Sequence, residues 1–351
     1  MSIAVDGATP SPRQKKERRA FRLLVAAGFA AYAVLVAVAW WGIANLLPDH
    51  LAVTLFGHAL HLNNLKDKIL GNASLMAVIL PAALWLECAS IGWEKSSARA
   101  LLKPTASMKT DLAYLLLDQA HVMGVVGRIM MLGGSLISGV ALRDFLAART
   151  GFAIDPTGLP LWLQVVIYFH VYSFFDYWAH RVGHTKWFWP LHRYHHAAED
   201  FCVVNGARLH PAGFVGIFLL NIPMPLLGAS PEVMIWVNVI TIALGFVIHS
   251  RMEAGFGWAG RWLVQSPLHH RLHHKLDMTT PTGFFSMTPL WDRLFGGWSE
   301  EATPNIAIGV DTPYRHGLWV APDLLRDYAD FWKGLVGKRK LYPSELTPPA
   351  S

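Results

Sequence analysis

Histidines crowd the run Tyr177-Trp-Ala-His-Arg-Val-Gly-His-Thr-Lys-Trp-Phe-Trp-Pro-Leu-His-Arg-Tyr-His-His196, which directly follows an apolar segment. Within it, His180 and His184 are four residues apart, whereas His192, His195 and His196 follow with offsets of three and four. On a helix, these offsets bring side chains toward one face. The spacing therefore predicts compact patches of imidazole, each able to meet a metal ion.

The same spacing returns farther along the chain, in His270-Arg-Leu-His-His274. The chain has 17 histidines, and 12 of them lie between His170 and His274. Imidazole is a good ligand for iron, zinc, copper and nickel, and a poor one for magnesium or calcium. One structural zinc ion needs only four ligands. Three spaced groups of histidines therefore predict two ions. Neutral imidazoles leave such a site positively charged, which favours oxygen chemistry by iron, although zinc fits the same donors.

Two neighbouring residues are candidate supports for the ligands: Asp176 could accept a ligand's ring N–H or simply be an acid at the helix end, and His170 could be a supporting donor, a satisfied polar group or a further ligand. His170 lies about three turns before His180 on the same expected helix, and Asp176 lies about one turn before it. Two further histidines stand apart, His249 at the end of an apolar segment and His210 just before Pro211.

The composition points to a membrane. Hydrophobic residues make up 53% of the chain and charged residues only 15%, with a mean hydropathy of +0.32, whereas soluble domains carry about 25% charged residues. The net charge of +6 does not indicate nucleic-acid binding, because the densest basic run, residues 13–19, directly precedes an apolar segment. Two cysteines make no disulfide framework.

Apolar segments of the length that spans a bilayer occur four times, and a fifth is broken by prolines and Gly228 into an expected helical hairpin. They cover about 21–47, 69–93, 112–141, 159–179 and, for the hairpin, 212–248. The sequence therefore predicts an all-α membrane protein: a transmembrane helical stem of about four spans plus a hairpin, with a cytosolic histidine-rich helical cap. Counting spans from a cytoplasmic N-terminus puts 180–211 and 249–351 on the cytoplasmic side.

Three stretches divide the chain. Residues 1–20 are expected to form a basic cytosolic tail, 21–340 a single integral membrane domain with its metal-binding part at 168–297, and 341–351 a flexible C-terminal tail.

The motifs together resemble the fatty acid hydroxylase / sterol desaturase superfamily of membrane di-iron enzymes, nearer its bacterial sterol desaturase-type members. The resemblance rests on 177–184, 191–196, Arg208-Leu-His-Pro211, His249-Ser250, 266–274 and Trp291-Asp-Arg-Leu-Phe-Gly296, in that order. It implies a helical fold in which a cap carries two irons. Carried over residue by residue, it implies the ligands His180, His184, His192, His195, His196, His249, His270, His273, His274 and His210.

The same resemblance implies that dioxygen serves as co-substrate and that a C–H bond of a lipid, fatty acyl or sterol-like, is hydroxylated or desaturated. Electrons are expected from an external donor, such as a ferredoxin, a cytochrome b5-like protein or a reductase. The expected location is the inner membrane of the cell, with several spans and the metal site facing the cytoplasm. In one departure from the family pattern, Ala212-Gly213 follow Arg-x-His-Pro where an acid is common, and the first 160 residues carry no motif that aligns.

Two other functions stay open at this point. A membrane zinc hydrolase acting on a lipid is one, but such enzymes usually keep a His-Glu-x-x-His motif, which the chain lacks. A metal or proton transporter is the other, but transport places ionisable residues near the bilayer midplane, whereas the histidines gather at segment ends.

Overall fold

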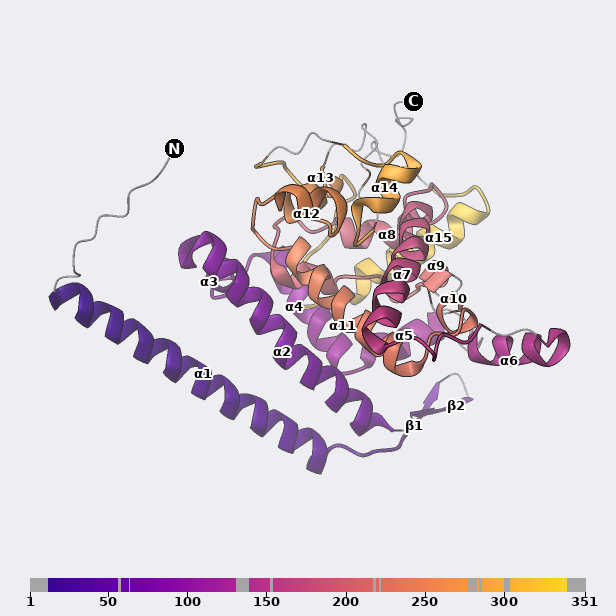
Figure 1. Cartoon of the computed structure of the whole chain (residues 1–351), viewed down its shortest axis with the longest axis horizontal. Coiled ribbons are helices and arrows are strands. Elements are labelled where there is room, and N and C mark those ends of the chain that lie inside the picture. Colours follow the sequence, from indigo (N-terminus) through magenta and orange to yellow (C-terminus); the bar gives the residue numbers. More distant parts are fainter. Residues whose placement is uncertain are drawn as a thin grey trace. The chain divides into compact units, whose positions relative to one another are not determined.

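The structure is a computed structural model. It describes residues 12–55, 58–62, 64–130, 139–151, 154–216, 219–220, 222–276, 283, 286–299 and 304–339. Two compact units divide the chain, Met1–Ala77 and Val78–Ser351. Helices dominate both, as expected from the sequence (Figure 1).

The first unit contains α1 (Pro12–Leu46), a β-hairpin and the beginning of α2 (Leu65–Ile91). In the hairpin, β1 (Leu51–Leu55) pairs antiparallel with β2 (His58–Leu62). The strands were not predicted, because each is only five residues long. Residues 12–20, expected as a tail, belong to α1. Residues 1–11 and 341–351, the remaining expected tails, lie outside the described residues.

The second unit holds all the histidines of the expected metal site. Its elements after the end of α2 are η1 (Trp93–Lys95), α3 (Ser97–Ala100), α4 (Ala106–Gln119), α5 (Val122–Met130), α6 (Gly139–Thr150), α7 (Leu161–Gly183), α8 (Trp189–His196), η3 (Val203–Ala207), α9 (Phe214–Gly216), α10 (Pro223–Leu226), α11 (Pro231–Ile248), α12 (Gly257–Trp262), α13 (Pro267–His273), α14 (Pro289–Phe295) and α15 (Ala321–Leu335).

Three of these helices begin in the same way, with a hydroxyl residue followed by proline. In α11 the Ser230 side chain accepts the N–H of Val233, and in α13 Ser266 accepts that of His269. Thr288 does the same for α14. The hydroxyl satisfies an N–H that lacks a helical partner, and proline fits the first turn because it needs none. The local sequence thus sets where each helix starts.

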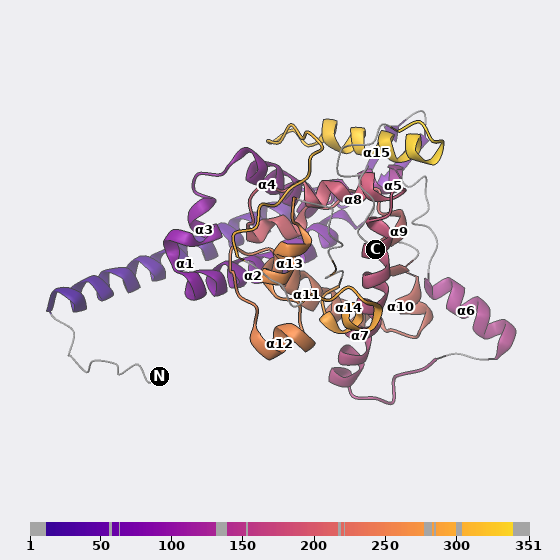
Figure 2. The same ribbon diagram turned by 90° about the horizontal axis from the view of Figure 1, so that it is seen from above.

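The packing of these helices brings the histidine-bearing segments together. α11 packs against α7, α13 and η3, and α15 packs along α8. A buried cluster of Tyr168, Met224, Ala229, Val233 and Val237 joins α7, α10 and α11. As a result, the last turn of α7 and the end of α11 lie beside α8 and α13 (Figures 1 and 2).

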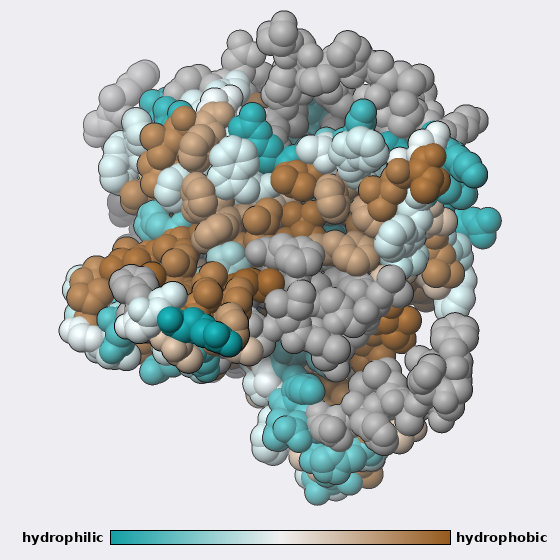
Figure 3. Space-filling view, turned by 90° about the vertical axis from the view of Figure 1, so that its right-hand side faces the viewer, coloured by the Kyte–Doolittle hydropathy of each residue, from teal (hydrophilic) through white to brown (hydrophobic). Residues whose placement is uncertain are grey.

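Two helices are long and apolar enough to cross a membrane, α2 and α11, and α1 adds a shorter apolar stretch, Ala30–Leu46. On the face drawn in Figure 3, hydrophobic side chains gather in a broad area that hydrophilic side chains border. Among the described residues, these two helices are fewer than the spans expected from the sequence.

The expected third and fifth segments differ most from the prediction. Within 112–141, α4 ends at Gln119 and α5 starts at Val122, because His121 adopts a left-handed φ of 63° that stops the helix. Residues 131–138 lie outside the described part. In 212–248, α11 is a full arm, whereas the first arm consists of the short α9 and α10 where it is described. α7 covers the fourth segment, yet it is not among the two candidate spans.

Candidate metal centre

Five histidines from three helices form the first group. His180 lies in the last turn of α7, and His184 is the residue that ends this helix. Their possible ligand nitrogens lie within 4.8 Å of one another. The Nε2 atom of His273 is 2.9 Å from that of His180 and 3.2 Å from that of His184. The group consists of His180, His184, His192, His196 and His273.

Four histidines form the second group, His195, His249, His270 and His274, all buried. His249 is the residue that ends α11. The Nε2 atom of His270 lies 2.8 Å from that of His249 and 3.1 Å from that of His274. The possible ligand nitrogens of this group also lie within 4.8 Å of one another.

Helical geometry divides the two repeated motifs between the groups. Adjacent residues on a helix point about 100° apart, whereas residues four apart nearly align. In α8, His192 and His196 therefore join the first group, while His195 joins the second. The rings of His196 and His274 stack with centroids 4.3 Å apart where the groups meet. The spacing seen in the sequence thus produces two adjoining clusters.

A glycine allows α8 to approach the end of α7. A Cβ atom at Gly183 would lie 3.1 Å from Cγ of His192, which is tighter than ordinary van der Waals contact. Glycine between His180 and His184 therefore leaves room for a histidine from the next helix.

Backbone carbonyls fix the orientation of three rings. The Nδ1–H groups of His195 and His249 donate to the carbonyl oxygens of Arg208 and Gly245, at 3.0 and 2.6 Å. His273 donates in the same way to Gly283, at 2.8 Å. A neutral imidazole carries one proton, so each of these rings presents a lone pair at Nε2.

These lone pairs face other imidazole nitrogens. The Nε2 atoms of His195 and His249 are 3.4 Å apart, although both rings carry their proton on Nδ1. Two facing lone pairs repel each other, and a cation between them turns the repulsion into two coordinate bonds. The donor set therefore fits a metal ion, and its nitrogen-only chemistry fits iron or zinc.

Burial keeps the rings neutral. It lowers the pKa of His196, His249 and His274 well below the ordinary value, and the neighbouring imidazoles lower it further. For His195, burial lowers the pKa to about 4. Neutral imidazole is the form that binds metals, so the site needs little proton release to accept an ion near neutral pH.

A buried ion pair supports His195. Arg208, whose carbonyl accepts the His195 N–H, pairs with Asp111 of α4 at 3.2 Å, and neither side chain is exposed. Asn205 donates to the same carboxylate. Sequence reasoning placed Arg208 in a motif but missed Asp111, since their separation of 97 residues leaves no local signal.

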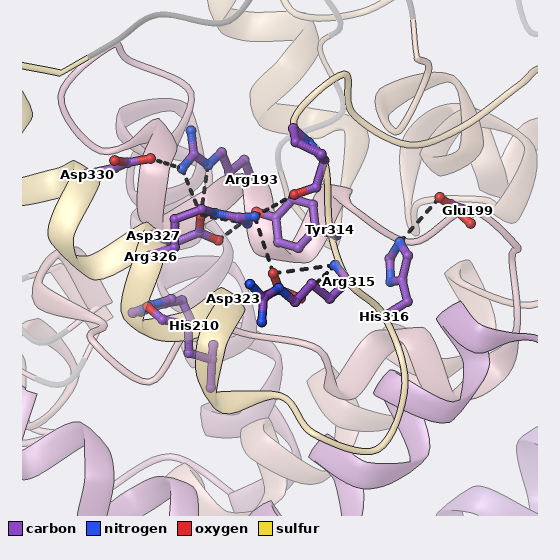
Figure 4. Close-up of polar contacts among 12 residues, drawn as sticks. Arg193, Glu199, His210, Tyr314, Arg315, His316, Asp323, Arg326, Asp327 and Asp330 are labelled. Atoms are coloured by element: carbon purple, nitrogen blue, oxygen red, sulfur yellow. Dashed lines mark hydrogen bonds and ion pairs between the residues drawn. The ribbon is translucent and has the colours of Figure 1, made fainter.

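A second buried ion pair holds α8 itself. Arg193, between His192 and His195, donates to Asp327 at 2.7 Å and also to Asp330, both on α15 (Figure 4). The Tyr314 hydroxyl donates to Asp327 at 2.6 Å. These partners could not be predicted from the sequence either, since more than 100 residues separate them from Arg193.

The structure brings nine of the ten expected ligands together and leaves out His210. Its Nε2–H donates to the carbonyl oxygen of Leu324, and its Nδ1 accepts the N–H of Ala212, at 2.9 and 3.1 Å. Both ring nitrogens therefore bind backbone groups, and His210 links the segment before α9 to the first turn of α15.

The two expected supporting residues both lie on α7, the helix that carries His180. His170 contacts the carbonyl oxygen of Val166 through Nδ1 at 2.9 Å and lines an apolar pocket. Asp176 lies near Tyr172 and near Asp292 of α14.

The region that contains the centre is similar to known proteins. A family model described as fatty acid hydroxylase matches residues 165–297, which include all nine histidines. An ornithine lipid hydroxylase of Rhizobium tropici is 30% identical over 156 residues, covering 43% of this chain and 46% of the relative. Methylsterol monooxygenase 2-2 of Arabidopsis thaliana is 28% identical over 150 residues, covering 39% and 54%. An alkylglycerol monooxygenase of Xenopus tropicalis is 26% identical over 129 residues, covering 36% and 28%.

The chain spans about half the length, or less, of these curated relatives. No solved structure matches. The matched region nevertheless has nearly the limits that the motifs indicate, and it contains the two histidine groups in full. Residues 165–297, the part of the chain that carries the nine histidines, match the fatty acid hydroxylase family.

Proposed function

We propose that the chain is an O₂-dependent membrane di-iron oxidoreductase that hydroxylates or desaturates a C–H bond of a lipid. The observation that carries the proposal is the gathering of nine imidazoles, six of them buried, into two adjoining groups with convergent nitrogens. The names of the relatives, which include lipid hydroxylases and sterol monooxygenases, support a lipid as the substrate class.

Nine residues would hold the two irons: His180, His184, His192, His196 and His273 the first, and His195, His249, His270 and His274 the second. Iron held in this way supplies the activation of O₂ that oxidation of an unactivated C–H bond requires. The protein orients three of the nine rings, those of His195, His249 and His273, through backbone carbonyls, and burial keeps rings such as those of His196, His249 and His274 neutral. Asp176 remains a proposed partner near His180, on the same helix one turn away.

An apolar pocket beside α7 offers a place for the lipid. Its volume is about 590 Å³, within the usual range for ligand pockets of about 300–1,000 Å³. One polar residue, His170, is present among lining residues that are otherwise apolar or aromatic: Val166, Ile167, Val171, Phe174, Phe175, Leu227 and Trp291. Such walls select a hydrocarbon chain or ring system over a charged substrate, because they offer little to replace the lost hydration.

We place the protein in the inner membrane as a multi-pass protein with the centre at its cytoplasmic side. His249 directly follows α11, one of the two candidate spans, so the second group lies at the end of a span rather than within one. A lipid dissolved in the bilayer would then reach the pocket sideways. Electrons would come from an external donor such as a ferredoxin, a cytochrome b5-like protein or a reductase.

The test is anaerobic loading of the purified protein with Fe(II), followed by O₂, a reductant and total membrane lipid. We expect a lipid that gains one oxygen atom or loses two hydrogen atoms, detected by mass spectrometry. His184→Ala together with His249→Ala is the matched inactive control. A lipid change that proceeds without O₂, or that zinc supports as well as iron, would refute the proposal.

A further inference from the structure

Glu87 is a fully buried carboxylate near the end of α2, outside the part of the chain that matches the fatty acid hydroxylase family. It accepts three hydrogen bonds. One oxygen accepts the N–H of Ser97, and the other accepts the Ser97 hydroxyl at 2.8 Å and the N–H of Arg251 at 2.6 Å. Two of these three donors belong to the backbone, so the carboxylate sets the course of the chain at both places.

The first of these places adjoins His249. Arg251 is two residues beyond the histidine that ends α11, and the intervening Ser250 is fully buried. The His249 ring is held from its own helix through the Gly245 carbonyl. After His249, the hydrogen bond from the Arg251 N–H to Glu87 fixes the direction in which the backbone leaves α11.

The second place lies close to the Phe201 segment, whose ring stacks on the same imidazole. The Ser97 hydroxyl, which donates to Glu87, accepts the N–H of Val203 at 3.1 Å. Two residues before Val203, the Phe201 ring stacks on His249 with a centroid distance of 5.8 Å and an interplanar angle of 17°. Phe201 also meets His274 edge-on, at 5.4 Å. Glu87 therefore anchors, through Ser97, the segment that covers the His249 ring.

We propose that Glu87 is a positioning residue for the second histidine group: through the Arg251 backbone and the Ser97–Val203 link, it keeps the His249 imidazole aimed at the position shared with His195, His270 and His274. The proposal deepens the metal centre proposed above and rests on it. Mutation of residues that support metal ligands without binding the metal themselves typically lowers metal affinity by about 10- to 100-fold.

An amide cannot replace this carboxylate. Both Glu87 oxygens accept a backbone N–H, from Ser97 and from Arg251. In Glu87→Gln, one of these positions would hold an NH₂ group, which faces an N–H donor and cannot accept. The substitution keeps the size of the side chain and breaks one anchor, which makes it a specific probe.

The experiment measures metal binding by the full-length chain in detergent. We expect the unsubstituted protein to bind two Fe(II) ions per chain. Glu87→Gln should bind the second ion about 10- to 100-fold more weakly and retain the first. Co(II) absorption spectra of Glu87→Gln should match those of His249→Ala, which disables the second group, and differ from those of His184→Ala. Hydrogen exchange should become faster in residues 201–204 and 249–252.

Asp323→Asn is the matched control. Asp323 is also a buried carboxylate that accepts a backbone N–H, that of Arg315 at 3.2 Å, but it contacts no segment of the second group in the interactions that the structure describes for it. We expect this variant to bind both ions as the unsubstituted chain does.

Equal affinity of Glu87→Gln and the unsubstituted chain for both ions would overturn the proposal. Loss of both ions together would overturn it too, because that result indicates a general structural role. If Glu87→Gln does not fold, Ser97→Ala decides: it removes the link to Val203 and should weaken the second ion alone. A properly folded unsubstituted chain that binds no metal would instead refute the metal centre itself, so the two failures are distinguishable.

Discussion

At the level of single residues, the two imidazole nitrogens decide what each histidine can do. His249 uses Nδ1 for a backbone carbonyl and keeps Nε2 for the cluster, whereas His210 uses both nitrogens for backbone groups. Both are buried, and both belong to recognisable motifs. The difference could not be predicted from the sequence, because the partner of His210 is Leu324, which is 114 residues away.

This contrast gives a paired prediction. His249→Ala should lower the iron content from two ions per chain to about one, because it removes one of the four imidazoles of the second group and so weakens the binding of that ion alone. His210→Ala should keep both ions, since neither of its nitrogens faces the cluster. Metal analysis after anaerobic loading measures both. Iron loss in His210→Ala equal to that in His249→Ala would contradict the assignment.

At the level of elements, α15 acts on the centre without contributing a ligand. The ion pair between Arg193 and Asp327 is buried on both sides, and it joins α15 to the helix that supplies three histidines. Neither α15 nor α4, which supplies Asp111, lies within the family match. Segments outside the family match therefore carry part of the support for the site.

Removal of Asp327 from its ion pair with Arg193 should lower the stability of the folded protein. In Asp327→Ala, Arg193 would keep a buried charge beside Asp330 alone, and breaking a buried pair in this way costs about 3–5 kcal/mol. The melting temperature in detergent should fall accordingly. Leu325→Ala, on the same helix with 60% of its side chain exposed, should change it little. A similar fall in both variants would mean that the packing of α15, and not the ion pair, is what matters.

The pocket on α7 yields a prediction about turnover. Val171→Trp should fill part of the cavity and reduce lipid oxidation by about 10-fold or more, since contacts in an apolar pocket are worth about 1–3 kcal/mol per group. The iron content should stay at two, because the histidines are untouched. Leu161→Trp, on the same helix but not among the lining residues, is the control of equal bulk. Unchanged turnover of Val171→Trp would exclude this cavity as the lipid site.

At the level of the whole molecule, helix content and the histidine groups could be predicted, and the number of spans could not. Histidines three and four residues apart lie toward one face of a helix, so the grouping of the histidines in 180–196 and 270–274 could be predicted from their spacing. The break at His121 carries no such signal, because neither glycine nor proline stands there. Ion pairs such as Arg208 with Asp111 depend on the finished fold, where burial and not sequence proximity selects the partners.

The metal-free protein should lose stability in mild acid. In the unfolded chain these histidines titrate at a pKa of about 6.5, whereas burial lowers the pKa of His196, His249 and His274 in the folded state. The unfolded state therefore binds more protons below about pH 6.5, and stability present above that value is lost as the pH falls. Thermal unfolding at pH 7.5 and 5.5 measures the effect, and bound iron should reduce it. A metal-free protein that melts at the same temperature at both values would contradict the neutral, buried state of the rings.

The neighbours His195 and His196 face different clusters from consecutive positions of one short helix. A rotation of α8 about its axis would therefore move both rings at once and change their positions in both groups. Inserting one residue between His192 and His195 would rotate the later side chains of α8 by about 100° around the helix axis. His195 and His196 would then both point away from their groups, so both groups would be disrupted.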